Sequence, residues 1–315
     1  MGKILRIATL GDYVDYYSHF LYGTMEGAIR CGAWFRPIAL FGTSLDKIKE
    51  QVDFFKPNIL LCHCIFNRHP HNREEVLGML KMLRKKYGTK VFYHAGDART
   101  QPRYPQDISD FVDVCLVNHL ELKQLEEIWK VKCYNWPYAC LHQYRISDVD
   151  PDMVQDLVFT GSLSDVNHHA PRAAFIKHLS QKVKVKVYPD DRIGNSRFFT
   201  DVVSASAKAV LGFQMGCDIN GYVDVRPFQY IGAGALYIQD KHNNMDYFFQ
   251  EGQHYAGFER DNIESFCEVY QRYVVDYPYE GEAIRKQGFK YAQSVHSTKV
   301  RMEKVIQIYQ NGGKP

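Results

Sequence analysis

Short apolar runs alternate with longer amphipathic segments along the whole chain. In the first half the apolar runs contain few polar positions, as expected for strands of a parallel sheet that helices cover on both faces. The segments between them have helical periodicity. One of these, 72–87, begins with Asn72 and Glu75 and ends before Gly88, which is a typical set of caps. The predicted strands of this half are 4–10, 37–41, 58–64, 90–94, 112–118 and 131–136, and a further helix is predicted at 43–55.

The alternation stops at 142–156, a polar and acidic stretch that contains Pro151, and then starts again. We therefore predict an α/β protein with two Rossmann-like, doubly wound domains, residues 1–145 and 155–295, joined by this stretch. The second half predicts strands at 157–161, 183–188, 209–213, 235–239 and 254–258, and helices at 171–181, 196–206, 225–233 and 282–309.

The composition narrows the class of protein. A chain of 315 residues, 45% of them hydrophobic, can bury the cores of two domains, and its net charge of +3 is too small to indicate nucleic-acid binding by itself. The eight cysteines are scattered, mostly in strand-like runs, which favours buried thiols in a reducing compartment. No apolar run reaches the ~18–20 residues of a membrane-spanning helix. We expect a cytoplasmic globular protein without membrane insertion.

The segment 221–240 places an arginine on the first turn of a short helix. The first amides of a helix have no intrahelical partner and carry the positive end of its dipole, so Arg226 beside them predicts a site for an anion such as a diphosphate. Gly234 lets the chain turn from this helix into the next strand. Ser162 and Arg172, which follow the first strand of the same domain, are further candidates for anion contact, and the alternative is a polar loop with a surface arginine.

Several motifs of the second half together resemble the C-terminal half of GT-B glycosyltransferases of the CgeB-like, spore-protein-type group. That group carries the pattern R-x-F-E-x-x-A/G-x-G-x-x-x-x-x-D, followed by a helix with H-T/S-x-x-x-R. In this chain Gln229 stands where the group usually has glutamate. The first half of the chain shares with the group only the alternation of predicted strands and helices. The matching residues are Arg226, Phe228, Gly234, Asp240, His296, Ser297 and Arg301, together with F-T-G-S at 159–162 and Arg172.

The resemblance implies a GT-B fold, with two domains facing a central cleft and the C-terminal helix, 296–315, packing back on the first domain. It implies transfer of a sugar from a nucleoside-diphosphate donor, which we expect to be a UDP-sugar, to an acceptor hydroxyl, with no metal and no other cofactor. Arg226 would contact the diphosphate, and Gln229 would lie where glutamate holds the ribose or sugar hydroxyls. The expected donor-binding residues are Ser162, Arg172, Tyr188, Arg226, Phe228 and Gln229, with Tyr188 beside the base.

The loop after the first strand, 11–19, is too rich in acids and aromatic residues to be a phosphate loop. Its tyrosines offer flat faces on which an acceptor can stack, and Asp12 or His19 could take the proton of an attacking hydroxyl. The alternative is a solvated turn that caps the following helix. The candidate acceptor-binding residues of this loop are Tyr13, Tyr16 and Tyr17.

The loop after the fourth strand, 94–99, is the second candidate for the catalytic centre. Asp97 is the leading base, and Gly96 beside it lets the backbone approach a ligand closely. Arg99 could contact the acceptor, or it could pair with Asp97, lower the pKa of that carboxyl and so favour a structural role. Retaining GT-B enzymes often use a histidine near this position, so His94 is a candidate as well.

A group of cysteines and histidines at 62–71 has the composition of a zinc site but not its spacing. Cys62 and Cys64 share one face of a predicted strand while His63 points to the other face, and no second pair of ligands follows. We therefore predict no metal. The residues of this group are Cys62, His63, Cys64, His69 and His71.

Residues 68–103 hold an excess of lysine and arginine, which is expected for a solvated helix face but also suits an anionic acceptor such as DNA. One alternative is therefore a phage-type DNA glycosyltransferase that acts on hydroxymethylpyrimidine bases. Another is a catalytically silent GT-B protein with a coat or scaffold role, since Gln229 departs from the group's pattern. A dinucleotide-dependent oxidoreductase is disfavoured because neither half opens with G-x-G-x-x-G.

Overall fold

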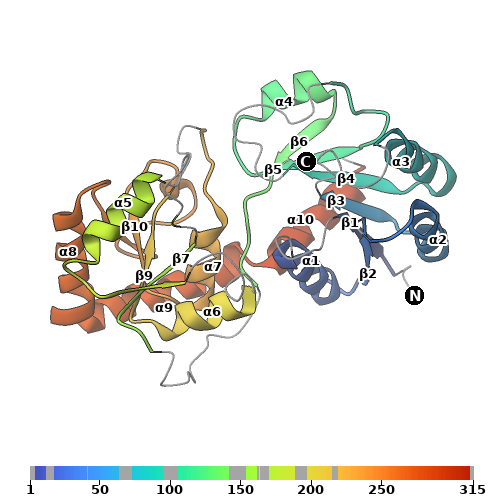
Figure 1. Cartoon of the computed structure of the whole chain (residues 1–315). Coiled ribbons are helices and arrows are strands. Elements are labelled where there is room, and N and C mark those ends of the chain that lie inside the picture. Colours follow the sequence, from blue (N-terminus) through green and yellow to red (C-terminus); the bar gives the residue numbers. More distant parts are fainter. Residues whose placement is uncertain are drawn as a thin grey trace. The chain divides into compact units, whose positions relative to one another are not determined.

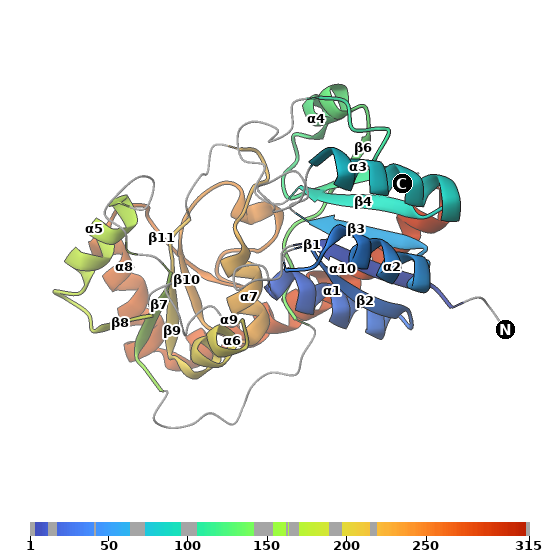
Figure 2. The same ribbon diagram turned by 45° about the vertical axis from the view of Figure 1, so that its right-hand side comes forward.

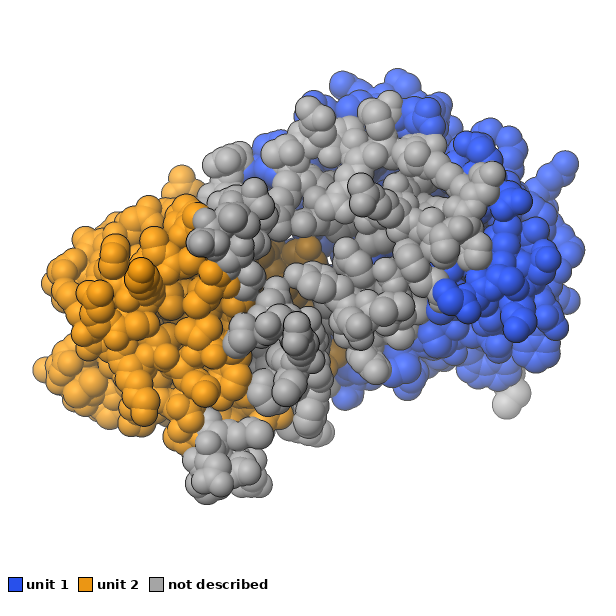
Figure 3. All heavy atoms as spheres, viewed as in Figure 1, with its two compact units in different colours: residues 1–137, 219–222, 298–315 blue, residues 138–218, 223–297 orange. Residues whose placement is uncertain are grey.

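The computed structural model describes residues 4–11, 18–40, 42–63, 73–95, 106–141, 154–161, 163, 170–188, 197–214 and 219–312. The chain forms two compact units, which Figure 3 distinguishes by colour. Unit 1 comprises residues 1–137, 219–222 and 298–315, and unit 2 comprises residues 138–218 and 223–297.

Unit 1 contains a parallel, six-stranded sheet in the order β2-β1-β3-β4-β5-β6 (Figure 1). Its strands lie within or beside the apolar runs of the sequence, because strands buried on both faces need continuous apolar side chains. The strands are β1 (Arg6–Gly11), β2 (Trp34–Ala39), β3 (Ile59–His63), β4 (Lys90–Ala95), β5 (Val114–Val117) and β6 (Lys132–Asn135). The helices are α1 (Ser18–Arg30), α2 (Leu45–Phe55), α3 (Arg73–Tyr87), α4 (Leu122–Trp129) and α10 (Thr298–Gln310).

Side chains of the unit 1 sheet alternate between two cores. Leu60 and Tyr93 belong to the core that α2, α3 and α4 complete, whereas Leu61 and Phe92 belong to the core that α1 and α10 complete. Helices α1 and α10 lie side by side (Figure 2), and a Cβ atom added to Gly27 would lie only 2.6 Å from the carbonyl oxygen of Thr298. The C-terminal helix α10 is thus an integral part of unit 1.

Unit 2 contains a parallel, five-stranded sheet in the order β11-β10-β9-β7-β8. The prediction of two doubly wound α/β sheets is therefore confirmed. The strands are β7 (Leu157–Thr160), β8 (Val185–Tyr188), β9 (Ala209–Gly212), β10 (Tyr237–Asp240) and β11 (Ala256–Phe258). The helices are α5 (Ala170–Leu179), α6 (Arg197–Ser206), α7 (Val225–Ala233), the short η3 (Met245–Tyr247), α8 (Ile263–Tyr270), the π-helical turn η4 (Gln271–Asp276) and α9 (Pro278–Val295). Among the described helices, none is both long and apolar enough to cross a membrane.

The prediction of one long terminal helix, 282–309, is wrong, because the chain breaks between α9 and α10. At the break His296 is buried, and its Nε2 donates a hydrogen bond to the carbonyl oxygen of Phe248 at 3.1 Å. The carbonyl oxygen of His296 accepts from the amide of Cys140 at 3.0 Å, and Arg301 donates to the carbonyl oxygen of Pro137 at 3.0 Å. The first and last residues of the H-S-x-x-x-R motif therefore both hydrogen-bond to the segment 137–140.

Four basic residues in and after α3 pair with carboxylates of distant segments. Arg84 and Lys90 both pair with Asp113, at 3.0 and 3.1 Å. Lys81 pairs with Asp110 at 2.6 Å, and Lys86 lies 3.3 Å from Asp53. Exposed pairs of this kind contribute little stability, but they offset the positive charge that binding to a DNA backbone would require.

Candidate functional site

The carboxyl edge of the unit 2 sheet has a point where the strand order reverses. The chain goes from β7 to β8 on one side of β7 and then to β9 on its other side. The connections that follow the neighbouring strands β7 and β9 therefore lead toward opposite edges of the sheet. Ligands of open α/β sheets bind at the carboxyl ends of the strands at such a point. In unit 2 this position is marked by Gly161 after β7 and by Gln214 after β9.

The N-terminus of α7 carries its own carboxylate. Asp224 is the N-cap, and its side chain accepts a hydrogen bond from the amide of Arg226 at 2.8 Å. The other carboxylate oxygen pairs with Nη1 of Arg226, also at 2.8 Å, and the two side chains are 16% and 20% exposed. The predicted helix and arginine are therefore present, and in addition the carboxylate of Asp224, which was not among the predicted site residues, caps this helix. The signal was available, because aspartate is among the preferred N-cap residues.

The guanidinium of Arg226 also faces the end of β7. A Cβ atom added to Gly161 would lie 2.8 Å from Nη2 of Arg226, and the φ of Gly161 is 139°, a conformation that favours glycine. The arginine thus reaches the reversal point of the sheet, with Nη1 on Asp224 and Nη2 beside the backbone of Gly161. This geometry suits a bound anion that shares the guanidinium with Asp224.

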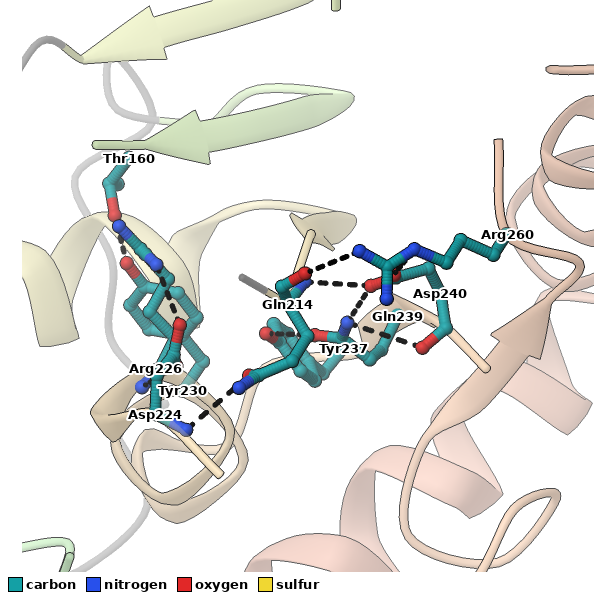
Figure 4. A network of polar contacts seen from close by, with 9 residues as sticks. All are labelled: Thr160, Gln214, Asp224, Arg226, Tyr230, Tyr237, Gln239, Asp240 and Arg260. Atoms are coloured by element: carbon teal, nitrogen blue, oxygen red, sulfur yellow. Dashed lines mark hydrogen bonds and ion pairs between the residues drawn. The ribbon is translucent and has the colours of Figure 1, made fainter. Parts of the chain in front are cut away.

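A polar network runs from Asp224 across the carboxyl ends of β9 and β10 (Figure 4). The amide of Asp224 donates to Oε1 of Gln214 at 3.3 Å, and the amide of Gln214 donates to Oδ1 of Asp240 at 2.8 Å. The side chain of Gln239 also donates to Asp240. Arg260 donates to the carbonyl oxygen of Gln214 at 3.3 Å and lies 3.7 Å from Oδ2 of Asp240.

Two titratable groups of this edge have strongly shifted pKa values. Burial raises the pKa of Asp240 to about 7, although the hydrogen bond from Gln214 and the charge of Arg260 oppose the shift. Burial lowers the pKa of His242 to about 4, with the Asp224 carboxylate opposing this shift and Arg260 adding to it. Within the described residues neither ring nitrogen of His242 has a hydrogen-bond partner. His242 was not among the predicted site residues, and its only signal in the sequence was its position two residues beyond a strand.

The other predicted donor-binding residues have different surroundings. Arg172 is 1% exposed, with its guanidinium 5.4 Å from the ring centroid of Phe159, so it is not a surface arginine. Tyr188 ends β8 and is half-buried. Gln229 lies one turn after Arg226 in α7.

Phe228 is buried in the core of unit 2 and packs edge-on against His296, with ring centroids 5.2 Å apart. No part of this side chain is exposed, and its contact with a donor stays a prediction. Its effect on a ligand would pass through the position of α7.

Unit 1 has a polar group at the corresponding edge of its own sheet. His63 is the last residue of β3 and His94 is the last but one of the neighbouring strand β4; the two are paired in register, and their Nδ1 atoms are 2.9 Å apart. His94 was predicted as a catalytic candidate, whereas His63 was considered only as a zinc ligand. Among the described residues no group of three or more side chains could hold a metal ion.

Several predicted site residues cannot be compared with the structure. His19 lies in α1, but its side chain is outside the described part of the chain. The remaining predicted residues, which are Asp12, Tyr13, Tyr16, Tyr17, Asp97, Arg99 and Ser162, lie outside the described residues altogether.

Comparison with known proteins finds a family model that is similar to part of the chain and solved structures that are similar to nearly all of it. Residues 169–307 match the family model described as glycosyl transferase-like. No curated protein matches the chain. Similar solved structures include a glycosyltransferase from Rickettsia africae (10% identity, 98% of this chain and 99% of that chain covered, TM-score 0.60) and sucrose-phosphate synthase from Thermosynechococcus elongatus (10% identity, 98% of both chains covered, TM-score 0.59).

A third similar structure is Anabaena HepE in complex with UDP and glucose, with 10% identity, 98% of this chain and 100% of that chain covered, and a TM-score of 0.56. At such identities the likeness shows the fold. The GT-B fold that the sequence predicted is therefore confirmed.

Proposed function

We propose that this protein is a glycosyltransferase that moves a sugar from a nucleoside-diphosphate donor to an acceptor hydroxyl. The observation that carries the proposal is the position of Arg226 at the reversal point of the unit 2 sheet, within the segment that matches the glycosyl transferase-like family. We propose a UDP-sugar as the donor, because the similar Anabaena protein was solved with UDP and glucose.

The donor diphosphate would lie at the carboxyl edge of the sheet, beside the guanidinium of Arg226 and the backbone of Gly161. When the bond between the anomeric carbon and the diphosphate breaks, negative charge develops on the leaving phosphate oxygen, and a positioned guanidinium stabilises that charge. Asp224 would hold Arg226 in place through their 2.8 Å ion pair. Ser162 and Arg172 are proposed as further phosphate contacts, and Tyr188 as a contact of the base.

The acceptor would bind to unit 1. We keep Asp97, Asp12, His94 and His19 as candidates for the base. We propose that Tyr13, Tyr16, Tyr17 and Arg99 contact the acceptor.

We also propose that the chain belongs to the CgeB-like group, on the motif residues given above, and that it needs no metal. Its six cysteines within the described residues are free, which supports a location in the cytoplasm.

A panel of nucleotide sugars tests the proposed function directly. We expect one UDP-sugar to raise the melting temperature, because a ligand at 100 times its dissociation constant adds about 2.7 kcal/mol to the free energy of unfolding. Excess EDTA should leave that shift unchanged. If no nucleotide sugar shifts the melting temperature at millimolar concentration, the donor site is wrongly assigned, and if EDTA abolishes the shift, the proposed independence of metal is wrong.

Replacing Gln229 with alanine tests the proposed contact with the ribose. A lost neutral hydrogen bond weakens binding by about 0.5–1.5 kcal/mol, so we expect UDP to bind about 2- to 13-fold more weakly to Gln229→Ala. The control ligand is 2′-deoxy-UDP, which has no 2′-hydroxyl and should lose less affinity. Equal losses for both nucleotides in calorimetry would exclude a contact with the 2′-hydroxyl.

A further inference from the structure

Polar side chains share one face of the unit 1 sheet at its carboxyl edge. Alternation along β3 and β4 places His63 and His94 on the face that α1 and α10 cover, where Leu61 and Phe92 belong to the apolar layer below them, and Asn118 lies two residues beyond Leu116 of the same layer. All three polar side chains are buried. Asn118 follows β5 directly, so His94 on β4 lies between His63 on one side and the strand of Asn118 on the other.

Asn118 has hydrogen-bonding capacity that the protein does not use. Its amide oxygen and nitrogen are both buried, and neither has a hydrogen-bond partner among the residues that the structure describes. Leaving a buried polar group unsatisfied destabilises a fold, so such groups in native structures call for an explanation. A polar ligand that enters at the carboxyl edge, beside His94, would satisfy this amide.

The distance between the two histidines restricts their protonation. A hydrogen bond between two Nδ1 atoms, here 2.9 Å apart, needs one nitrogen that carries a proton and one that does not. In the uncharged pair one ring is therefore the Nδ1–H tautomer, which has a bare Nε2, and the other ring carries its proton on Nε2. The uncharged pair therefore has one basic Nε2 atom and one Nε2–H donor.

We propose that His63 is a positioning residue for His94. It accepts the hydrogen bond from Nδ1–H of His94 and so holds His94 in the tautomer whose bare Nε2 can accept the proton of the acceptor hydroxyl, with Asn118 binding the same acceptor. This inference rests on the proposed glycosyl transfer. It selects His94 from the four candidate bases, and it gives a role to a histidine that the sequence suggested only as a metal ligand.

The reaction step balances without another reactant. The acceptor oxygen forms a bond to the anomeric carbon while its proton moves to Nε2 of His94, and the bond from that carbon to the diphosphate breaks with its electron pair on the leaving phosphate oxygen. His94 is then an imidazolium, and its Nδ1–H bond to neutral His63 becomes a stronger, charge-assisted hydrogen bond. His63 thus stabilises the charge that develops on His94.

Nitrogen NMR of protein with ¹⁵N-labelled histidine decides the tautomer independently of activity. We expect a neutral Nδ1–H signal that disappears in His94→Asn. It should persist in His63→Asn, whose amide oxygen can still accept the hydrogen bond, and shift to the Nε2–H tautomer in His63→Leu. A His94 ring in the Nε2–H tautomer in the unmodified protein would overturn the proposal.

The rate of UDP-glucose hydrolysis, with water as the acceptor, tests the effect on catalysis. A base typically contributes about 10²–10⁴-fold, so we expect His94→Asn and His63→Leu to lose about 100-fold or more, while His63→Asn loses much less. The matched control is Cys62→Ala, a buried change on the opposite face of β3. Equal rates for His63→Leu and the control would refute the role of His63. If UDP does not bind even to the unmodified protein, the proposed function fails, and the NMR result alone judges the histidine pair.

Discussion

Replacing Arg226 with alanine is expected to weaken UDP binding by about 10- to 150-fold, because a hydrogen bond to a charged group is worth about 1.5–3 kcal/mol. The loss should lie toward the upper end of this range. Without Arg226 the carboxylate of Asp224, now 2.8 Å from the guanidinium, would remain unpaired beside the incoming phosphates. Isothermal titration calorimetry with UDP measures the effect.

Two controls separate a lost contact from a damaged fold. Arg272→Ala removes the same charge from an exposed position of unit 2, where the side chain pairs with Glu280, and should leave the dissociation constant unchanged. The double variant Asp224→Asn with Arg226→Ala should recover part of the lost affinity, since it removes the unpaired carboxylate. A folded Arg226→Ala variant that binds UDP as tightly as the unmodified protein would refute the donor-site assignment.

The pH dependence of stability is expected to change in opposite directions in variants of Asp240 and His242. The pKa of Asp240 is raised from 3.8 to about 7, so its contribution is fully present below pH ~4 and is lost as the pH rises to ~7. The pKa of His242 is lowered from 6.5 to about 4, so its contribution is present above pH ~6.5 and is lost as the pH falls to ~4. At 1.36 kcal/mol per pKa unit these losses are about 4 and about 3 kcal/mol. In the unmodified protein they largely cancel between pH 4 and 7.

Each substitution should reveal the pH dependence of stability that comes from the other group, which is no longer cancelled. Asparagine at position 240 can still accept the hydrogen bond from Gln214 but carries no charge, so Asp240→Asn should gain stability relative to the unmodified protein as the pH rises from 4 to 7. His242→Leu should gain stability as the pH falls over the same range. Urea unfolding at several pH values measures both differences, and the subtraction removes the groups that the proteins share. A difference that stays flat with pH would mean that the corresponding group is not buried in solution as it is in the structure.

The local elements of this protein followed from its sequence. The continuous apolar runs predicted parallel strands buried on both faces, and α7 lies at Val225–Ala233, where the sequence placed it. These predictions succeeded because they depend on periodicity and on caps, which are properties of neighbouring residues. The same local reasoning placed Arg226 on the first turn of a helix, and the structure brings that turn to the reversal point of a sheet.

Only the tertiary structure decided which polar groups meet. His63 and His94 are 31 residues apart, and they form a pair because β3 and β4 are neighbours in register. Asp240 and His242 have shifted pKa values because the fold buries them, and this burial could not be predicted from the residues next to them in the sequence. The break between α9 and α10 has the same cause. The sequence 282–309 is locally compatible with one helix, but the contacts of His296 with Phe248 and Cys140 come from segments far away along the chain. Periodicity determined the elements of this protein, whereas long-range packing determined its candidate sites.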